Sequence, residues 1–274
     1  MTPPSNQEMR IDPLRPLTEK SWLKPDWGAP VHVHACSTLR SGGVSRAQWG
    51  GAGGSADGLN LALHCGDANE DVLANRALLR EQLPAEPLWL EQIHGTTVHD
   101  ADLLLPEGGA VLPRADAAMT ARAGVVLAVL TADCLPILFT NASGSVVGLA
   151  HAGWRGLAGG VVQATVDALA ERTHDHQWLA WLGPAIGPSH FEVGMEVRDA
   201  FVDQDPGAAA GFAGTANPEK CYGDLFWLAR RRLEQAGVTK ISGGGLCTVS
   251  DPARFYSYRR DRMTGRMASL IWIE

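Results

Sequence analysis

Three short apolar runs in the middle of the chain constrain its fold more than any other feature. The runs are rich in Val, Ile and Leu, are separated by turn residues, and span 125–130, 137–139 and 146–150. Short apolar runs bounded by turn residues are typical of buried strands. We therefore predict that all three form strands in the interior of the fold.

Chemically active side chains stand at the ends of these predicted strands. Asp133 and Cys134 follow the first run, and His151, Trp154 and Arg155 follow the third. A side chain at the end of a buried strand is held rigidly by the scaffold and still reaches a cleft. The sequence therefore predicts a functional site at these strand ends.

The rest of the chain mixes strands and helices without strict alternation. Strands are expected at 31–37, 89–95, 178–182 and 267–273, and helices at 72–83, 157–172 and 223–235. We find no internal repeat and no Pro/Ser linker in the sequence. We therefore expect an α/β fold of the mixed α+β kind, with one domain (29–274) after an N-terminal lead-in (1–28).

Composition limits the partners of the chain. A net charge of −7 argues against nucleic acid or an anionic membrane surface as the main partner. No apolar segment approaches the roughly 18 residues of a membrane span. The five scattered cysteines, and a start that lacks the order of a signal peptide, favour reduced thiols. We expect a cytoplasmic protein with no nucleic-acid and no membrane partner.

His94, Cys134 and His151 form a candidate metal site. Two imidazoles and a thiolate suit zinc, and three protein ligands leave a fourth position open, as in catalytic zinc sites. No two of these residues share a short motif, so the spacing gives equal weight to an inert core thiol at Cys134. A further alternative is nucleophilic catalysis by Cys134, with His151 as the base and Asp133 as the orienting group. Asp133 can also hold a ligand imidazole through a hydrogen bond.

Several arginines are candidates for binding an anion. Arg155 stands near the start of a predicted helix, Arg40 and Ser41 precede two glycines, and Arg259 follows an aromatic segment. Guanidinium and backbone N–H groups that converge in this way bind phosphate. The alternative for each arginine is an ion pair on the surface.

Six motifs of this chain resemble the YfiH/laccase-domain family. They are WLEQIHG (89–95), TADCLP (131–136), AHAGWRG (150–156), WLGPAIGP (181–188), FEVG (191–194) and FYSYRRD (255–261). The match runs in order from near Ser37 to Ile273 and covers nearly the whole chain beyond the first thirty residues. The resemblance implies a layered sandwich of mixed sheets flanked by helices. It also implies that His94, Cys134 and His151 are zinc ligands.

The resemblance implies more than one activity. The family is described as a purine nucleoside phosphorylase with adenosine deaminase activity, as an editing amide hydrolase acting on peptidoglycan precursors of the UDP-MurNAc–amino acid type, and as a copper polyphenol oxidase. We expect the purine nucleoside enzyme, because one His–Cys–His site suits redox-inert zinc better than a cluster of coppers. The editing hydrolase is the alternative. A copper oxidase and a zinc-binding module without turnover are less favoured.

The expected site consists of two sets of residues. The catalytic set is the three metal ligands with Asp133. The substrate-binding set is Arg40, Ser41, Asn60, Gln92, Trp154, Arg155 and Arg259. A Gly-rich insert at 50–58, expected to be a mobile surface loop, and Ser189 with His190 depart from the family pattern. Both departures concern the rim of the pocket, so they bear on the substrate range more than on the metal. We expect small-molecule substrates and a monomer or weak homo-oligomer.

Overall fold

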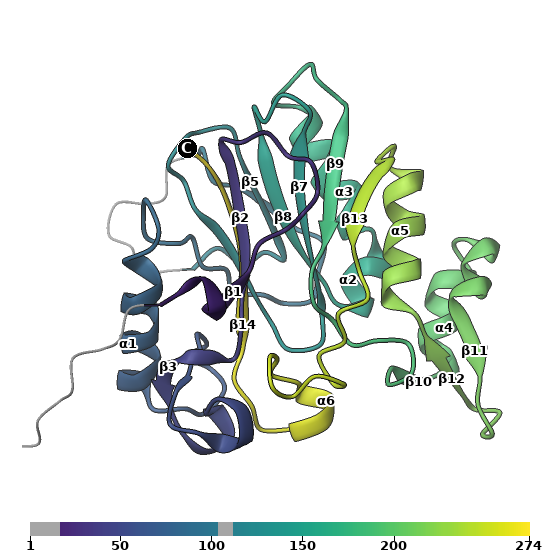
Figure 1. Ribbon diagram of the computed structural model, residues 1–274. Helices are drawn as coiled ribbons and strands as arrows, with labels where there is room; N and C mark the ends of the chain where they lie inside the picture. Colours follow the sequence, from purple (N-terminus) through teal and green to yellow (C-terminus); the bar gives the residue numbers. More distant parts are fainter. Residues whose placement is uncertain (1–16, 104–111) are drawn as a thin grey trace, which may run out of the picture.

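Two β-sheets packed face to face form the centre of the computed structural model, which describes residues 17–103 and 112–274 (Figure 1). The larger sheet has six strands in the spatial order β13 (Lys240–Gly243), β9 (Trp178–Leu182), β7 (Leu135–Asn141), β8 (Val147–Ala152), β5 (Ala117–Thr120) and β4 (Val98–Asp100). The second sheet has four strands in the order β1 (Trp22–Leu23), β2 (Val33–Thr38), β14 (Met267–Ile273) and β6 (Leu127–Thr131).

Alternating side chains of the central strands serve two cores. On β7, Ile137 and Phe139 belong to the core beneath the helices, whereas Leu138 belongs to the core between the two sheets. On β14, Ile271 faces the space between the sheets and Leu270 lies in the core on the outer face. Both faces of these strands are therefore buried, which is why their sequences are continuous apolar runs.

Helices cover the outer faces of the two sheets. The helices α2 (Trp154–Gly159), α3 (Val161–Ala170) and α5 (Leu225–Gln235) pack on the six-stranded sheet, and α1 (Asn69–Arg80) packs on the other sheet (Figure 1). The resulting order of layers is helix, sheet, sheet, helices. This arrangement confirms the predicted α/β sandwich of mixed sheets flanked by helices.

The remaining elements lie at the periphery. A third sheet contains β10 (Glu192–Gly194), β12 (Lys220–Gly223) and β11 (Phe212–Gly214), next to α4 (Met195–Val202). The other elements are β3 (Ser41–Ser45), α6 (Tyr258–Asp261) and the 3-10 helices η1 (Glu19–Ser21), η2 (Ala47–Trp49), η3 (Ala52–Gly54) and η4 (Pro206–Gly211). In the part of the chain that the structure describes, no helix is long and apolar enough to cross a membrane.

The structure differs from the sequence-based expectations at three places. The single helix predicted at 157–172 is two helices, because Gly160 has a left-handed backbone (φ 100°) that ends α2. The segment 89–95 has one isolated bridge, between Glu91 and Arg114, instead of a strand. Residues 1–16 of the predicted lead-in lie outside the described residues, and its later part adds β1 to the edge of β2.

Candidate metal centre

The candidate centre lies at one end of the six-stranded sheet. In the antiparallel pair of β7 and β8, Leu135 at the start of β7 is paired with Ala152 at the end of β8. Cys134 directly precedes β7, and His151 is the last residue but one of β8. Antiparallel pairing therefore brings together the two strand ends that the sequence marks as chemically active.

His94 completes a group of three metal-ligating side chains. One ligand atom from each of His94, Cys134 and His151 lies within 4.8 Å of the other two. Cys134 Sγ is 4.0 Å from His94 Nε2, and the two imidazole rings meet edge to face with their centroids 4.8 Å apart. His151 is buried, Cys134 is half-buried and His94 is exposed. The group is thus held on one side by the core and open to solvent on the other.

The charges at the centre favour a thiolate. Burial raises the pKa of the Cys134 thiol, but His151 and His94 beside it lower this pKa to about 6. Burial lowers the pKa of His151, whereas the Cys134 sulfur and the Asp116 carboxylate raise it to about 9. A cysteine binds a metal as the thiolate, and a metal ion bound here would replace the proton of the imidazole.

Asp116 organises two of the three ligands. Its side chain is fully buried, and Oδ1 lies 2.8 Å from His151 Nδ1 and accepts a hydrogen bond from the His94 N–H at 2.9 Å. Oδ2 accepts hydrogen bonds from the N–H groups of Ile93 at 3.1 Å and Gly95 at 2.6 Å. Because Nδ1 of His151 is engaged with this carboxylate, Nε2 is the nitrogen available to a metal.

Two residues of the centre have a left-handed backbone. The φ angles are 59° for His94 and 93° for Asp133, which are uncommon values for residues other than glycine. Such conformations cost about 1–3 kcal/mol each and persist only where the surroundings hold them. At His94, the three consecutive N–H groups that point at Asp116 hold the turn. The same bonds explain why 89–95 is not an extended strand.

Asp133 directs its carboxylate away from the metal ligands. Its Oδ1 accepts a hydrogen bond from Thr248 Oγ1 at 2.5 Å, and Oδ2 accepts one from the Arg259 N–H at 2.6 Å. The carbonyl oxygen of Asp133 accepts a hydrogen bond from the Ile186 N–H at 2.9 Å. The residue that was expected to be catalytic therefore ties the loop of Cys134 to remote parts of the chain.

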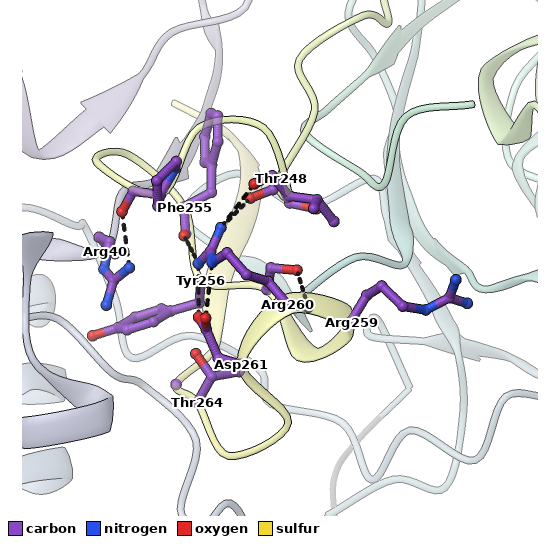
Figure 2. Close-up of polar contacts among 12 residues, drawn as sticks. Arg40, Thr248, Phe255, Tyr256, Arg259, Arg260, Asp261 and Thr264 are labelled. Carbon is purple, nitrogen blue, oxygen red and sulfur yellow. Dashed lines mark hydrogen bonds and ion pairs between the residues drawn. The ribbon is translucent and has the colours of Figure 1, made fainter. Parts of the chain in front are cut away.

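Arg260 fixes the C-terminal segment that Asp133 contacts, through hydrogen bonds to backbone carbonyl oxygens. Figure 2 shows its guanidinium between the carbonyl oxygens of Thr248 and Phe255, at 2.8 and 3.0 Å. The same guanidinium binds the carboxylate of Asp261, at 2.7 Å from Nη2 and 2.8 Å from Nε. The segment is therefore a rigid loop stabilised by charge-assisted hydrogen bonds.

Arg40 and Ser41, expected to bind substrate, hold the Gly-rich insert instead. Arg40 is 6% exposed and donates to the carbonyl oxygens of Gly50 at 3.0 Å and Pro252 at 2.8 Å. Ser41 Oγ accepts a hydrogen bond from the Ala52 N–H at 3.4 Å. The insert, expected to be a mobile surface loop, is thus hydrogen-bonded to the body of the protein.

The other two predicted anion-binding arginines also have partners. Arg259 Nη1 donates to the carbonyl oxygens of His190 and Glu192, each at 3.0 Å, and Figure 2 shows its guanidinium pointing away from that of Arg260. Arg155 is exposed, and its guanidinium carbon lies 4.4 Å from the centroid of the Trp154 ring. None of these side chains lines the pocket that contains the metal ligands.

The three ligands lie in a pocket of about 750 Å³, which is within the usual size range of small-molecule sites. Of the predicted substrate-binding residues, Gln92 lines it. Its side-chain amide is fixed to the backbone of Leu130 by a donated bond of 2.9 Å and an accepted bond of 2.8 Å. The wall also contains Arg76, Arg266 and His64, which the sequence analysis did not single out.

Asp116, Arg76 and Arg266 stand outside the sequence motifs, so the sequence marks them less clearly than the three candidate ligands. Asp116 stands before an apolar run that becomes β5, which is the same strand-end pattern that drew attention to Cys134 and His151. That signal was available in the sequence and was missed. Arg76 lies on the half-buried side of α1, and Arg266 lies just before β14, with no motif around either.

Comparisons with known proteins place this geometry in a family. The family model described as "Multi-copper polyphenol oxidoreductase laccase" matches residues 34–274. A purine nucleoside phosphorylase of Pseudomonas aeruginosa is 52% identical over 254 residues, which cover 93% of this chain and 99% of that protein. The purine nucleoside phosphorylase YfiH of Escherichia coli (strain K12) is 47% identical over 253 residues, covering 92% of this chain and 98% of that protein.

Solved structures share the fold over nearly their whole length. A protein of Neisseria meningitidis has a TM-score of 0.82 at 44% identity, covering 93% of this chain and 99% of that one. YlmD from Geobacillus stearothermophilus has a TM-score of 0.82 at 32% identity, covering 95% of this chain and 99% of that one. These similarities confirm the fold expected from the sequence motifs.

Proposed function

The chain belongs to the YfiH/laccase-domain family, and from this membership we propose that it is a zinc-dependent purine nucleoside enzyme. The proposed reactions are phosphorolysis of adenosine, inosine and guanosine-type nucleosides, and deamination of adenosine. One observation carries the proposal: the open His–Cys–His group lines a pocket of ligand size. The chain's relatives in Pseudomonas and Escherichia, named purine nucleoside phosphorylases, supply the substrate class.

The donor set supports zinc as the metal. His94 and His151 would bind through imidazole nitrogens and Cys134 through its sulfur, a set that suits zinc with one position left open. When bound, zinc acts as a Lewis acid and lowers the pKa of a water molecule towards about 7. Among the described residues, this is the one group of three or more such side chains. A multi-copper oxidase, as the name of the family model suggests, would need several sites.

The two proposed reactions balance without an oxidant. In phosphorolysis, a phosphate oxygen forms a bond to C1′ of the ribose, and the bond from C1′ to the purine nitrogen breaks with its electron pair on the base. A proton from hydrogen phosphate ends on that nitrogen. In deamination, water replaces the amino group at C6 of adenosine and ammonia leaves. Under this proposal the Gln92 amide, which lines the pocket, contacts the polar edge of the purine through the N–H and the oxygen lone pair that its two bonds to Leu130 leave free.

A second candidate function uses the same pocket. An amide hydrolase acting on a UDP-MurNAc–amino acid would need a site for the diphosphate of its substrate. Arg76 and Arg266 in the wall of the pocket carry the positive charge that a diphosphate site requires, and this observation favours the amide hydrolase. It predicts release of an amino acid and no dependence on added phosphate.

Elemental analysis of the purified protein, combined with nucleoside turnover, tests the proposal. We expect about one zinc per chain, ammonia from adenosine, and hypoxanthine from inosine only when phosphate is present. Cys134→Ala is expected to remove the metal and both activities while the circular dichroism spectrum stays native. Zinc without purine turnover would favour the amide hydrolase, and full turnover by a metal-free Cys134→Ala protein would refute the metal assignment.

A further inference from the structure

The backbone of Leu61 brings two arginines together at the wall of the pocket. The Leu61 N–H donates to the carbonyl oxygen of Arg266 at 3.3 Å, and the Leu61 carbonyl oxygen accepts from Arg76 Nε at 2.9 Å. Asn60, which is fully buried, accepts a hydrogen bond from the Arg266 N–H on Oδ1 at 2.9 Å. A helix residue and a residue near the C-terminus are thus attached to the same short stretch of chain.

Each guanidinium is oriented by contacts with the protein and has N–H groups that donate to no described residue. Arg76 lies over the ring of Trp89, with its guanidinium carbon 4.1 Å from the ring centroid, and only its Nε donates to a described residue. Arg266 donates from Nη1 to the carbonyl oxygens of Thr264 and Gly265, at 2.9 and 3.0 Å. Within the described residues, both Nη groups of Arg76 and the Nε and Nη2 of Arg266 have no hydrogen-bond partner.

The surroundings add an imidazole and hydroxyl groups. His64, Arg76 and Arg266 line the same pocket, and burial together with the positive charges of Arg266 and Arg76 lowers the pKa of His64, which favours its neutral, hydrogen-bonding form. The Tyr258 ring lies beside Arg266, with its centroid 5.8 Å from the guanidinium carbon. Thr264 lines the adjoining recess, and its buried hydroxyl has no partner among the described residues.

Glu91, the acidic residue in this wall, has an arginine partner of its own, and the charge of Glu86 acts on Arg76 from outside the pocket lining. Glu91 also lines the pocket, but its carboxylate is 3.3 Å from Nε of Arg114. Two guanidinium groups with free donors, together with the buried hydroxyl of Thr264 in the adjoining recess, match a phosphate group in charge and in hydrogen-bond donors. A phosphate group has at least three acceptor oxygens and up to two negative charges, so it satisfies two guanidinium groups more fully than the single charge and two oxygens of a carboxylate.

We infer that Arg76 and Arg266 form a phosphate-binding subsite in the pocket that contains His94, Cys134 and His151. This inference rests on the proposed function for the source of the phosphate group. In phosphorolysis the subsite would hold inorganic phosphate against C1′ of the ribose. In the amide hydrolase it would hold the diphosphate of the nucleotide. Because the described structure gives Arg40 and Arg259 backbone partners, the subsite replaces the anion site expected at those residues.

Phosphate titration of the zinc-loaded enzyme tests the subsite, with Arg266→Gln and Arg76→Gln as variants. Arg122→Gln is the matched control, because Arg122 is exposed and follows the end of β5 opposite to Asp116. We expect each pocket variant to raise the half-saturating phosphate concentration for inosine about tenfold to a hundredfold. The half-saturating inosine concentration, the rate of adenosine deamination and the zinc content should change less than about twofold, the scatter of such measurements.

Calorimetric binding of phosphate and of UDP, without nucleoside, separates this inference from the proposed function. Loss of phosphate binding in both variants supports the subsite even if the wild-type protein turns over no nucleoside. Loss of UDP binding, with no phosphate binding in any form, supports the same subsite with a nucleotide as its source. Phosphate or UDP binding that is as tight in Arg266→Gln and Arg76→Gln as in the wild type would overturn it. Native circular dichroism of each variant is the check on folding.

Discussion

One carboxylate at the candidate centre contacts the segments of both histidine ligands. Asp116 binds Nδ1 of His151 and the N–H groups around His94, so it sets which imidazole nitrogen faces the metal and how the His94 turn is shaped. Residues that support a ligand imidazole raise its basicity and limit its motion. A single substitution at this position therefore tests how far the centre depends on its supporting contacts.

Asp116→Asn is expected to weaken zinc binding about tenfold to a hundredfold, because a neutral amide holds the His151 imidazole less strongly. Competition with a chromophoric chelator measures the affinity. Asp167→Asn, at an exposed position of α3, is the control and should leave the affinity unchanged. Equal zinc affinity of Asp116→Asn and wild type would show that the contact does not support the metal.

The lowered pKa of Asp116 predicts that the stability of the metal-free protein depends on pH. Burial raises the pKa of Asp116, but hydrogen bonds from His151 and the Gly95 N–H outweigh it, and the net pKa is below the ordinary value of 3.8. A lowered folded-state pKa stabilises the fold above the ordinary pKa, and this stabilisation is lost as the pH falls through the folded-state pKa. The stability difference between wild type and Asp116→Asn should therefore be large at pH 7 and shrink below about pH 4. Urea unfolding at several pH values measures it, and a pH-independent difference would contradict the assignment.

At the scale of elements, the turn between β8 and α2 forms the floor of the centre. Gly153 separates these elements, and a Cβ there would lie 3.0 Å from Cys134 Sγ and 3.1 Å from His94 Cδ2. A methyl group at this position fits only if Cys134 and His94 move away by a few tenths of an ångström. The motif glycine is therefore explained by close approach, since its φ of −62° is open to any residue.

Gly153→Ala is expected to lower the zinc affinity at least about tenfold, the usual scale of a disturbed ligand set, while the domain stays folded. Gly214→Ala on β11 is the matched control, because a Cβ there meets nothing within 4 Å. Zinc titration and thermal unfolding of both variants give the comparison. An unchanged affinity in Gly153→Ala would mean that the ligands can shift at no cost.

At the scale of the whole molecule, the core is formed independently of the centre. The buried clusters beneath the helices and between the sheets consist of apolar residues of the strands and helices, and none of the three metal ligands belongs to them. Structural zinc fingers differ, because they lack such a core and unfold without metal.

Removal of zinc by a chelator is therefore expected to leave a cooperatively folded protein. The apo protein should unfold at a lower temperature, because it loses the stabilisation that comes from binding to the folded state alone, about 4 kcal/mol at a thousandfold excess over Kd. Calorimetry and near-ultraviolet circular dichroism before and after chelation measure this, and added zinc should restore the transition. Loss of the cooperative transition in the apo protein would mean that the metal holds the fold together.

The sequence by itself determined the buried strands and pointed to the three candidate metal ligands. The strands at 178–182 and 267–273 have the predicted bounds, because an apolar run buried on both faces is a local property of the chain. Cys134 and His151 stand in motifs at strand ends, and His94 stands in the motif at 89–95, so the chemical type and the chain position of all three were visible.

Only the tertiary structure decided which partner each polar side chain has. Arg40 and Arg259, which local patterns marked as anion-binding candidates, bind backbone carbonyls, whereas Arg76 and Arg266, which stand in no motif, line the pocket. Asp116 reaches His151 across the pairing of β5 with β8, and no local signal specifies that contact. The physical reason is that burial depends on the periodicity of neighbouring residues, whereas a hydrogen bond depends on which distant segments the packed sheets bring within about 3 Å.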